Sequence, residues 1–242
     1  MKKHRVWGFT VSEVLIVLAI LGVLYSLTIS ILHYNYHRRT VQAGLADAFR
    51  EFNKAMFNYS AKKQCQGKLV CTGMFSNGHN AAEEIASEYQ TMQVGTNCWG
   101  NNRVINNNLD GSGDTTNLNN LNCFIDGKGR IFAIQTVSDC VTNYFDNNGA
   151  NANKRHKLQK SCGYLFIDLN GEKAPNAFGQ DVFIFIITDN SPSYLYPLGG
   201  KMLTSSYDNL STWPGTCGDG SQEGRTCAGR IIEEGWNVTY MK

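Results

Sequence analysis

The chain has 242 residues, a length that fits one medium domain with an appendage or two small domains. Hydrophobic residues make up 42% and aromatic residues 11%, which excludes a disordered chain. The formal net charge of +2 gives no reason to expect nucleic acid as a partner. Eight cysteines indicate an oxidising compartment.

A basic leader and a long apolar run open the chain. The leader, residues 1–8, carries Lys2, Lys3 and Arg5, and residues 14–32 contain no charged side chain. An apolar helix of about 20 residues crosses a bilayer core, and the positive-inside rule keeps the basic end in the cytoplasm. The sequence therefore predicts one membrane-spanning helix here, with the rest of the chain exported.

Three kinds of N-terminus fit parts of this pattern. A cleaved secretory signal fits poorly, because the apolar run is long and bulky residues follow it. A plain signal anchor fits the length and the charges, but it gives no role to Glu13, a carboxylate at the start of the apolar helix. An acid within a membrane helix is costly and points to a function.

The third kind explains the acid. The segment Gly8-Phe9-Thr10-Val11-Ser12-Glu13, followed by the apolar run, resembles the class III signal of type IV pilins and type II secretion pseudopilins. The resemblance implies that prepilin peptidase cuts between Gly8 and Phe9 and methylates the new amino terminus of Phe9. Glu13 then becomes the fifth residue of the mature chain, as in that family. The motif covers a small part of the chain but has all its parts in register.

Charge pairing gives this motif a physical role. Cleavage frees the amine of Phe9 at the edge of the hydrocarbon, and Glu13 lies one helical turn away, about 6 Å along the axis. A neighbouring subunit shifted by that distance would place its Glu13 beside this amine, so that each charge is paired within the bilayer. Thr10 and Glu13 also fit a capping box, which is compatible with the pairing role.

Helical periodicity continues beyond the apolar run. No proline lies between Phe9 and Lys63, so the pattern predicts one helix from about residue 10 to 61. Residues 9–32 are expected in the membrane, and residues 33–62 form the amphipathic continuation. Its apolar stripe is expected to dock on the chain's own sheet, with a coiled-coil seam as the alternative. The stripe consists of Val41, Leu45, Ala48, Phe49, Phe52, Met56 and Tyr59.

Residues 63–242 are expected to form an exported globular domain, so that the whole chain is of the α+β class. Strands are predicted at residues 123–125, 130–136, 163–169 and 181–188. Between and after them the patterns predict a short helix capped by Asn80 at 80–92, loops at 97–122 and 189–230, and an apolar tail at 231–240. A four-stranded antiparallel sheet against the long helix matches the pilin-like α/β roll that the resemblance implies.

The eight cysteines are expected to staple loops as disulfides. Short loops close at low entropic cost, which favours neighbour pairing, although the sequence alone leaves the connectivity open. Neighbour pairing gives Cys65–Cys71, Cys98–Cys123, Cys140–Cys162 and Cys217–Cys227. The last pair resembles the C-terminal disulfide loop of many type IV pilins. Zinc is the rival interpretation, but the sequence contains neither a C-x-x-C motif nor closely paired cysteine and histidine ligands.

One segment offers oxygen ligands. Asp168, Asn170 and Asp181 lie near a turn, and the segment begins like a calcium loop, as some pseudopilins hold calcium in this region. The remaining ligands of such a loop are missing, so a hairpin turn is the better interpretation. No cofactor is therefore expected, and calcium is the minor alternative.

The sequence contains no catalytic motif, so we expect a structural subunit and no enzyme. Expected partners are other pilin subunits, prepilin peptidase and an inner-membrane assembly platform. The chain would enter the bacterial inner membrane as a single-pass precursor and end in a periplasmic or cell-surface filament. The large, cysteine-rich domain favours a type IV pilus subunit. The alternatives are a type II secretion pseudopilin and, from another class, a membrane-anchored periplasmic enzyme or binding module.

Overall fold

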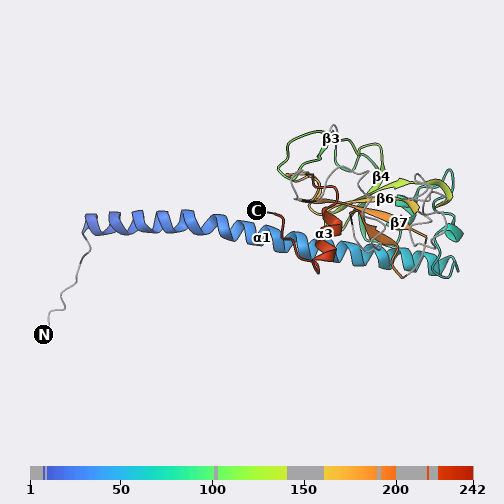
Figure 1. Ribbon diagram of the computed structural model, residues 1–242, viewed down its shortest axis with the longest axis horizontal. Coiled ribbons are helices and arrows are strands. Elements are labelled where there is room, and N and C mark those ends of the chain that lie inside the picture. The colour runs from blue at the N-terminus through green and yellow to red at the C-terminus, as the bar shows by residue number, and fades with distance from the viewer. Residues whose placement is uncertain are drawn as a thin grey trace. The chain divides into compact units, whose positions relative to one another are not determined.

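The computed structural model describes residues 8, 10–100, 103–140, 161–189, 192–199, 217 and 223–241. The chain divides into two units between Thr40 and Val41, and each unit is described by itself. Helix α1 (Val11–Lys62) begins in the first unit and ends in the second (Figure 1). Its bounds agree with the helix predicted from about residue 10 to 61.

The first unit consists of the N-terminal part of α1. The segment Val11–Ile29 has a mean hydropathy of 2.2, and none of it is buried within the protein. The hydroxyl group of Thr28 donates a hydrogen bond to the carbonyl of Leu24 at 3.0 Å, so the helix itself satisfies this polar group. By length and composition, the segment fits a membrane anchor or a signal sequence.

The second unit is built on a six-stranded antiparallel sheet in the order β1-β4-β5-β6-β7-β8. The α+β class is therefore confirmed. The four predicted strands correspond to the central four, but the predicted number is wrong because each edge carries one more strand. The strands are β1 (Thr91–Thr96), β4 (Asn122–Asp126), β5 (Ile131–Thr136), β6 (Ser161–Asp168), β7 (Val182–Thr188) and β8 (Leu195–Pro197).

The predicted helix over residues 80–92 is too long. Helix α2 (Ala81–Ala86) begins as predicted, because the side chain of Asn80 accepts a hydrogen bond from the amide of Glu83 at 3.3 Å. Soon after it, the carbonyl of Gln90 accepts a hydrogen bond from the amide of Gly127 at 2.7 Å. This contact fixes the chain beside the β4–β5 turn, where it continues as β1 instead of as a helix.

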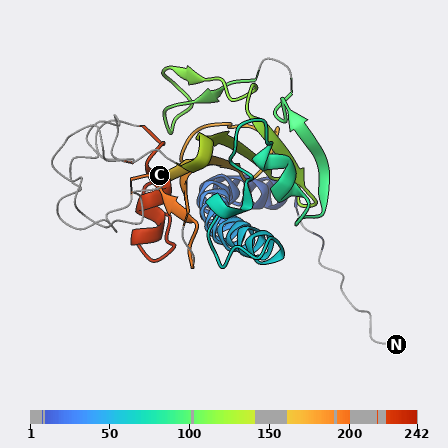
Figure 2. The same ribbon diagram turned by 90° about the vertical axis from the view of Figure 1, so that its right-hand side faces the viewer.

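The central strands β6 and β7 are buried on both faces of the sheet. One face packs on the second part of α1 (Figure 2). There the rings of Phe52 and Phe132 stack with centroids 5.9 Å apart. The other face packs against loops that contribute Trp99 and Phe178 to one apolar cluster. The predicted stripe of α1 is confirmed, with only Phe49 left partly exposed. Its buried members are Val41, Leu45, Ala48, Phe52, Met56 and Tyr59.

Short elements lie within segments that the sequence predicts as loops. A two-stranded sheet, β2 (Ile105–Asn106) with β3 (Thr115–Thr116), lies within residues 97–122. Helix α3 (Cys227–Glu233) covers the border between the predicted loop 189–230 and the predicted tail. These elements are too short to produce a periodic pattern. Two 3₁₀ helices, η1 (Val70–Thr72) and η2 (Ser138–Cys140), complete the second unit.

Four disulfides join the cysteines in neighbour order: Cys65–Cys71, Cys98–Cys123, Cys140–Cys162 and Cys217–Cys227. They account for all eight cysteines, and none is free. The structure therefore agrees with neighbour pairing, and no thiolate remains to bind zinc.

Candidate functional site

The first turn of α1 contains the acid that the sequence analysis singled out. One carboxylate oxygen of Glu13, Oε2, accepts hydrogen bonds at 2.8 Å from both the amide and the hydroxyl group of Thr10. The amide of Glu13 donates in return to the Thr10 hydroxyl at 3.3 Å. This reciprocal pair is the capping box that the sequence predicts. Gly8 is exposed just before it, while Phe9 and residues 1–7 lie outside the described part of the chain.

The capping box leaves part of the carboxylate available. Both bonds from Thr10 end on Oε2 of Glu13, and within the described part of the chain Oε1 has no hydrogen-bond partner. A carboxylate has lone pairs for several donors, so an outside cation can bind while the cap is kept. Glu13 is also fully exposed on an apolar helix, where a charge without a partner would be costly in a membrane.

A network of charged side chains joins α1 to the β4–β5 turn in the second unit. The ammonium group of Lys128 lies 2.6 Å from Oδ2 of Asp47 and 2.8 Å from Oε1 of Glu51. The guanidinium group of Arg130 lies 3.0 Å from Asp47 and also contacts Glu51. Its third carboxylate partner is Asp126, at 2.6 Å. We call these five residues the clamp.

The clamp combines an exposed pair and a buried one. The Lys128 side chain is 54% exposed, whereas those of Arg130 and Asp126 are each 4% exposed. The hydrogen bond from Lys128 lowers the pKa of Asp47, and the same bond raises the pKa of Lys128. Asp47 and Lys128 therefore remain ionised near neutral pH, and the clamp holds the sheet to α1 by electrostatics as well as by apolar contact.

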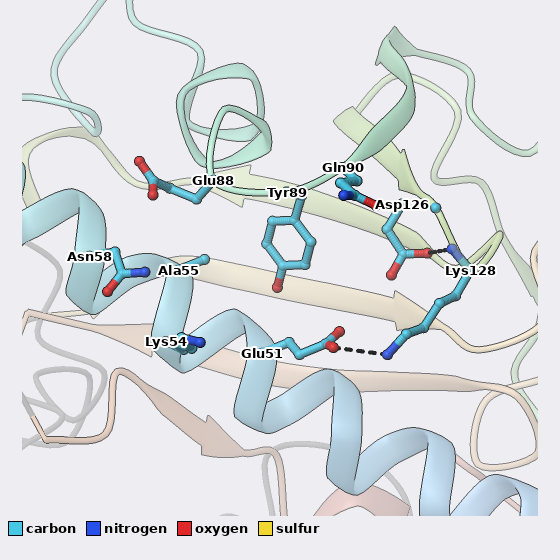
Figure 3. Close-up of a pocket in the computed structure, with 10 residues that line it drawn as sticks. Glu51, Lys54, Ala55, Asn58, Glu88, Tyr89, Gln90, Asp126 and Lys128 are labelled. Carbon is cyan, nitrogen blue, oxygen red and sulfur yellow. Dashed lines mark hydrogen bonds and ion pairs between the residues drawn. The ribbon is translucent and has the colours of Figure 1, made fainter.

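A pocket of about 410 Å³ lies beside the clamp (Figure 3). Within it, Glu51 pairs with Lys128, and Tyr89 rests on the core with its ring centroid 5.0 Å from that of Phe124. Burial raises the pKa of the Tyr89 hydroxyl. Of the described residues, those that line the pocket are Glu51, Lys54, Ala55, Asn58, Glu88, Tyr89, Gln90, Asp126, Gly127 and Lys128.

The candidate calcium residues serve as anchors of a turn. Oδ1 of Asp168 accepts hydrogen bonds from the amides of Asn170 and Gly171, at 3.1 and 2.9 Å, and Oδ2 accepts one from the indole of Trp99 at 2.7 Å. The carboxylate of Asp181 accepts two backbone hydrogen bonds, each at 2.8 Å. Within the described ranges, no group of three His, Cys, Asp or Glu side chains could hold a metal ion.

Sequence reasoning found Glu13 but missed the clamp. Asp47 and Glu51 occupy the polar face of an amphipathic helix, where charged residues usually contact only solvent. Lys128 lies at a hairpin tip, also an exposed position by default. The alternation of charge in Asp126-Gly127-Lys128-Gly129-Arg130 was the available signal, but its partners lie far away in the sequence.

No protein-family model matches this chain, and no curated protein or solved structure matches it either.

Proposed function

We propose that this protein is a structural subunit of a type IV pilus-like filament. The leader is removed between Gly8 and Phe9, the mature chain stays in the membrane by the first part of α1, and subunits assemble through these helices. The observation that carries the proposal is Glu13 at the start of an exposed apolar helix, with one carboxylate oxygen that makes no hydrogen bond to the described residues.

Packing of apolar helices supports the assembly step. The segment Val11–Ile29 presents apolar side chains on all sides. Ala19, Gly22 and Ser26 are spaced at three and four residues, so they form a strip of small side chains where another helix can approach closely. Helices that pack in this way, each with its Glu13 beside the amine of a neighbour, form an ordered filament core.

The second unit has the features expected of the outward-facing domain of such a subunit. Its sheet covers the amphipathic part of α1, as in the α/β roll expected of pilins, and the disulfides and the clamp stabilise it without a cofactor. A domain of this size with four disulfides favours an exposed pilus subunit over a secretion pseudopilin.

Two variants separate the charge of Glu13 from its capping role. In Glu13→Gln, the side-chain carbonyl still accepts the capping hydrogen bonds, but the negative charge is lost. We expect this variant to be cut and to stay in the membrane at the parental level, yet to form no filaments in electron micrographs of native cells. Glu13→Ala loses both features and should fail in the same way.

Ser12→Ala is the matched control, because it changes a polar side chain in the same turn and leaves Glu13 intact. It should assemble like the parent. Normal filaments from Glu13→Gln would contradict charge pairing and leave Glu13 as a cap alone. If neither the parent nor any variant formed filaments in its native host, the chain would be a membrane-anchored domain instead.

A further inference from the structure

Strand β1 is an open edge of the sheet. It hydrogen-bonds to β4 on one side, and no described strand lies on its other side. Five of its six residues are exposed, among them Met92 at 72% and Val94 at 41%. Figure 2 shows β1 at the right-hand margin of the sheet, opposite the end that carries α3. Its outer backbone groups therefore have no strand partner among the described residues.

This edge lacks the charged side chains and the proline that usually protect an edge strand, and its one irregularity is the register shift between Thr91 and Gln93. Residues 91–100 contain no Asp, Glu, Lys, Arg or Pro, although charged side chains and proline are the common means of preventing edge-to-edge pairing. The opposite edge strand, β8, has three buried residues, ends in Pro197 and contacts α3. The sheet is thus closed at one edge and open at the other.

Part of β1 is regular enough to accept another strand. Gln93, Val94, Gly95 and Thr96 pair in unbroken register with β4, and the register shift is confined to the segment between Thr91 and Gln93. The side chains of Gln93, Val94 and Thr96 in this segment are exposed, so a second strand could pair along it in the antiparallel pattern.

We propose that β1 pairs antiparallel with β1 of a second copy of this chain, so that two sheets become one across a two-fold axis. In such a pair, each residue of the segment faces a residue of the same segment. A charged residue in this segment would then lie close to the same charge on the second copy, and the repulsion would oppose pairing. The segment has no charge, so a second copy meets no repulsion, while a charged peptide finds no attraction. This inference does not depend on filament assembly.

Cysteine cross-linking tests the contact and its register. Since none of the native cysteines is free, one introduced cysteine is the only reactive thiol. Single cysteines would replace Met92, Gln93, Val94 or Thr96 in the full chain in detergent micelles, and Val104→Cys, 39% exposed outside β1, is the control. After mild oxidation, we expect the disulfide-linked dimer to be most abundant at Val94→Cys, near the centre of the regular segment, and to decrease to either side. Equal cross-linking at all positions, the control included, would overturn the proposal, as would none at any position.

Charge variants test the self-pairing directly and without a thiol. Two differently tagged copies of the parent should co-purify from micelles. Copies that both carry Val94→Lys, or both carry Val94→Glu, should co-purify about fivefold less. A mixture of the Lys and Glu variants should recover the parental yield, and Val104→Lys should match the parent. Co-purification that is unaffected by like charges at position 94 would assign the contact to another surface, such as the apolar part of α1, and would overturn the proposal.

Discussion

The ammonium nitrogen of Lys128 lies 2.6 Å from Oδ2 of Asp47, which joins the tip of the β4–β5 turn to helix α1 across a sequence separation of 81 residues. Beneath this exposed pair, Arg130 holds the same helix from a buried position. The helix and the sheet are therefore joined by the ion pairs of Lys128 and Arg130 with Asp47 and Glu51, in addition to the stacking of Phe52 on Phe132.

The buried half of the clamp should matter far more than its exposed half. Arg130→Met leaves Asp126 buried without its partner and should lower the free energy of unfolding by about 3 kcal/mol. Lys128→Met removes an exposed pair and should cost about 0.5 kcal/mol. Urea unfolding of the full chain in micelles, followed by tryptophan fluorescence, measures both. Lys173→Met, at an exposed position outside the clamp, is the control and should not change stability. Equal losses for Arg130 and Lys128 would contradict this ranking.

Acid should weaken the clamp. The hydrogen bond from Lys128 lowers the pKa of Asp47 below its ordinary value. This contribution to stability is complete above the unfolded pKa of about 4 and is lost as the pH falls through the lower folded value. The free energy of unfolding should therefore fall below about pH 4 in the parent, and less steeply in Asp47→Asn. If the free energy of unfolding fell equally with pH in the two proteins, Asp47 would not be the residue responsible for the acid sensitivity.

Rising pH should act on a different acid. Burial, with the nearby charge of Asp181, raises the pKa of Asp168 to about 8. Its stabilising contribution is complete below the unfolded value of about 4 and is lost as the pH rises through the folded value. Unfolding measured between about pH 5 and pH 9 should show this decline in the parent, and Asp168→Asn should flatten it. A parental stability that is constant over this range would contradict the assignment.

Loop length should rank two of the disulfides. Cys98–Cys123 spans 25 residues and Cys65–Cys71 spans 6. A longer closed loop lowers the conformational entropy of the unfolded chain more, and for this difference in loop length the added stability is about 1 kcal/mol. The Cys98→Ala/Cys123→Ala double variant should thus lose more stability than Cys65→Ala/Cys71→Ala, and its cysteines also lie in the apolar cluster. Thermal unfolding of the two double variants makes the comparison. The opposite order would show that loop closure does not dominate.

The predictable part of the fold is the part with strong periodicity. The stripe from Val41 to Tyr59 and the apolar runs of β6 and β7 indicated their structures directly, because burial on a helix face or within a sheet leaves a regular pattern. Strand β1 leaves none, since it is exposed on both faces. The segment 87–92 reads as helical by composition, but packing of Tyr89 on Phe124 and Phe132 overrides that preference.

In the candidate site, too, one part could be predicted from the sequence and another could not. Glu13 was evident because a lone acid beside an apolar run violates the expected composition of a membrane helix. Its capping partner, Thr10, followed from local spacing. The clamp could not be found in this way, since Asp47 and Lys128 become neighbours only after the sheet has folded onto α1. Long-range ion pairs of this kind leave no local signal.

Cleavage between Gly8 and Phe9 can be read from the intact mass and the N-terminal sequence of the protein isolated from native membranes. We expect a mature chain that begins at Phe9 and is heavier by one methyl group, with all eight cysteines oxidised. A chain that begins at Met1 would contradict it and leave a signal anchor with an unexplained glutamate. A chain that begins beyond residue 30 would also contradict it, because the protein would then be secreted without its membrane helix.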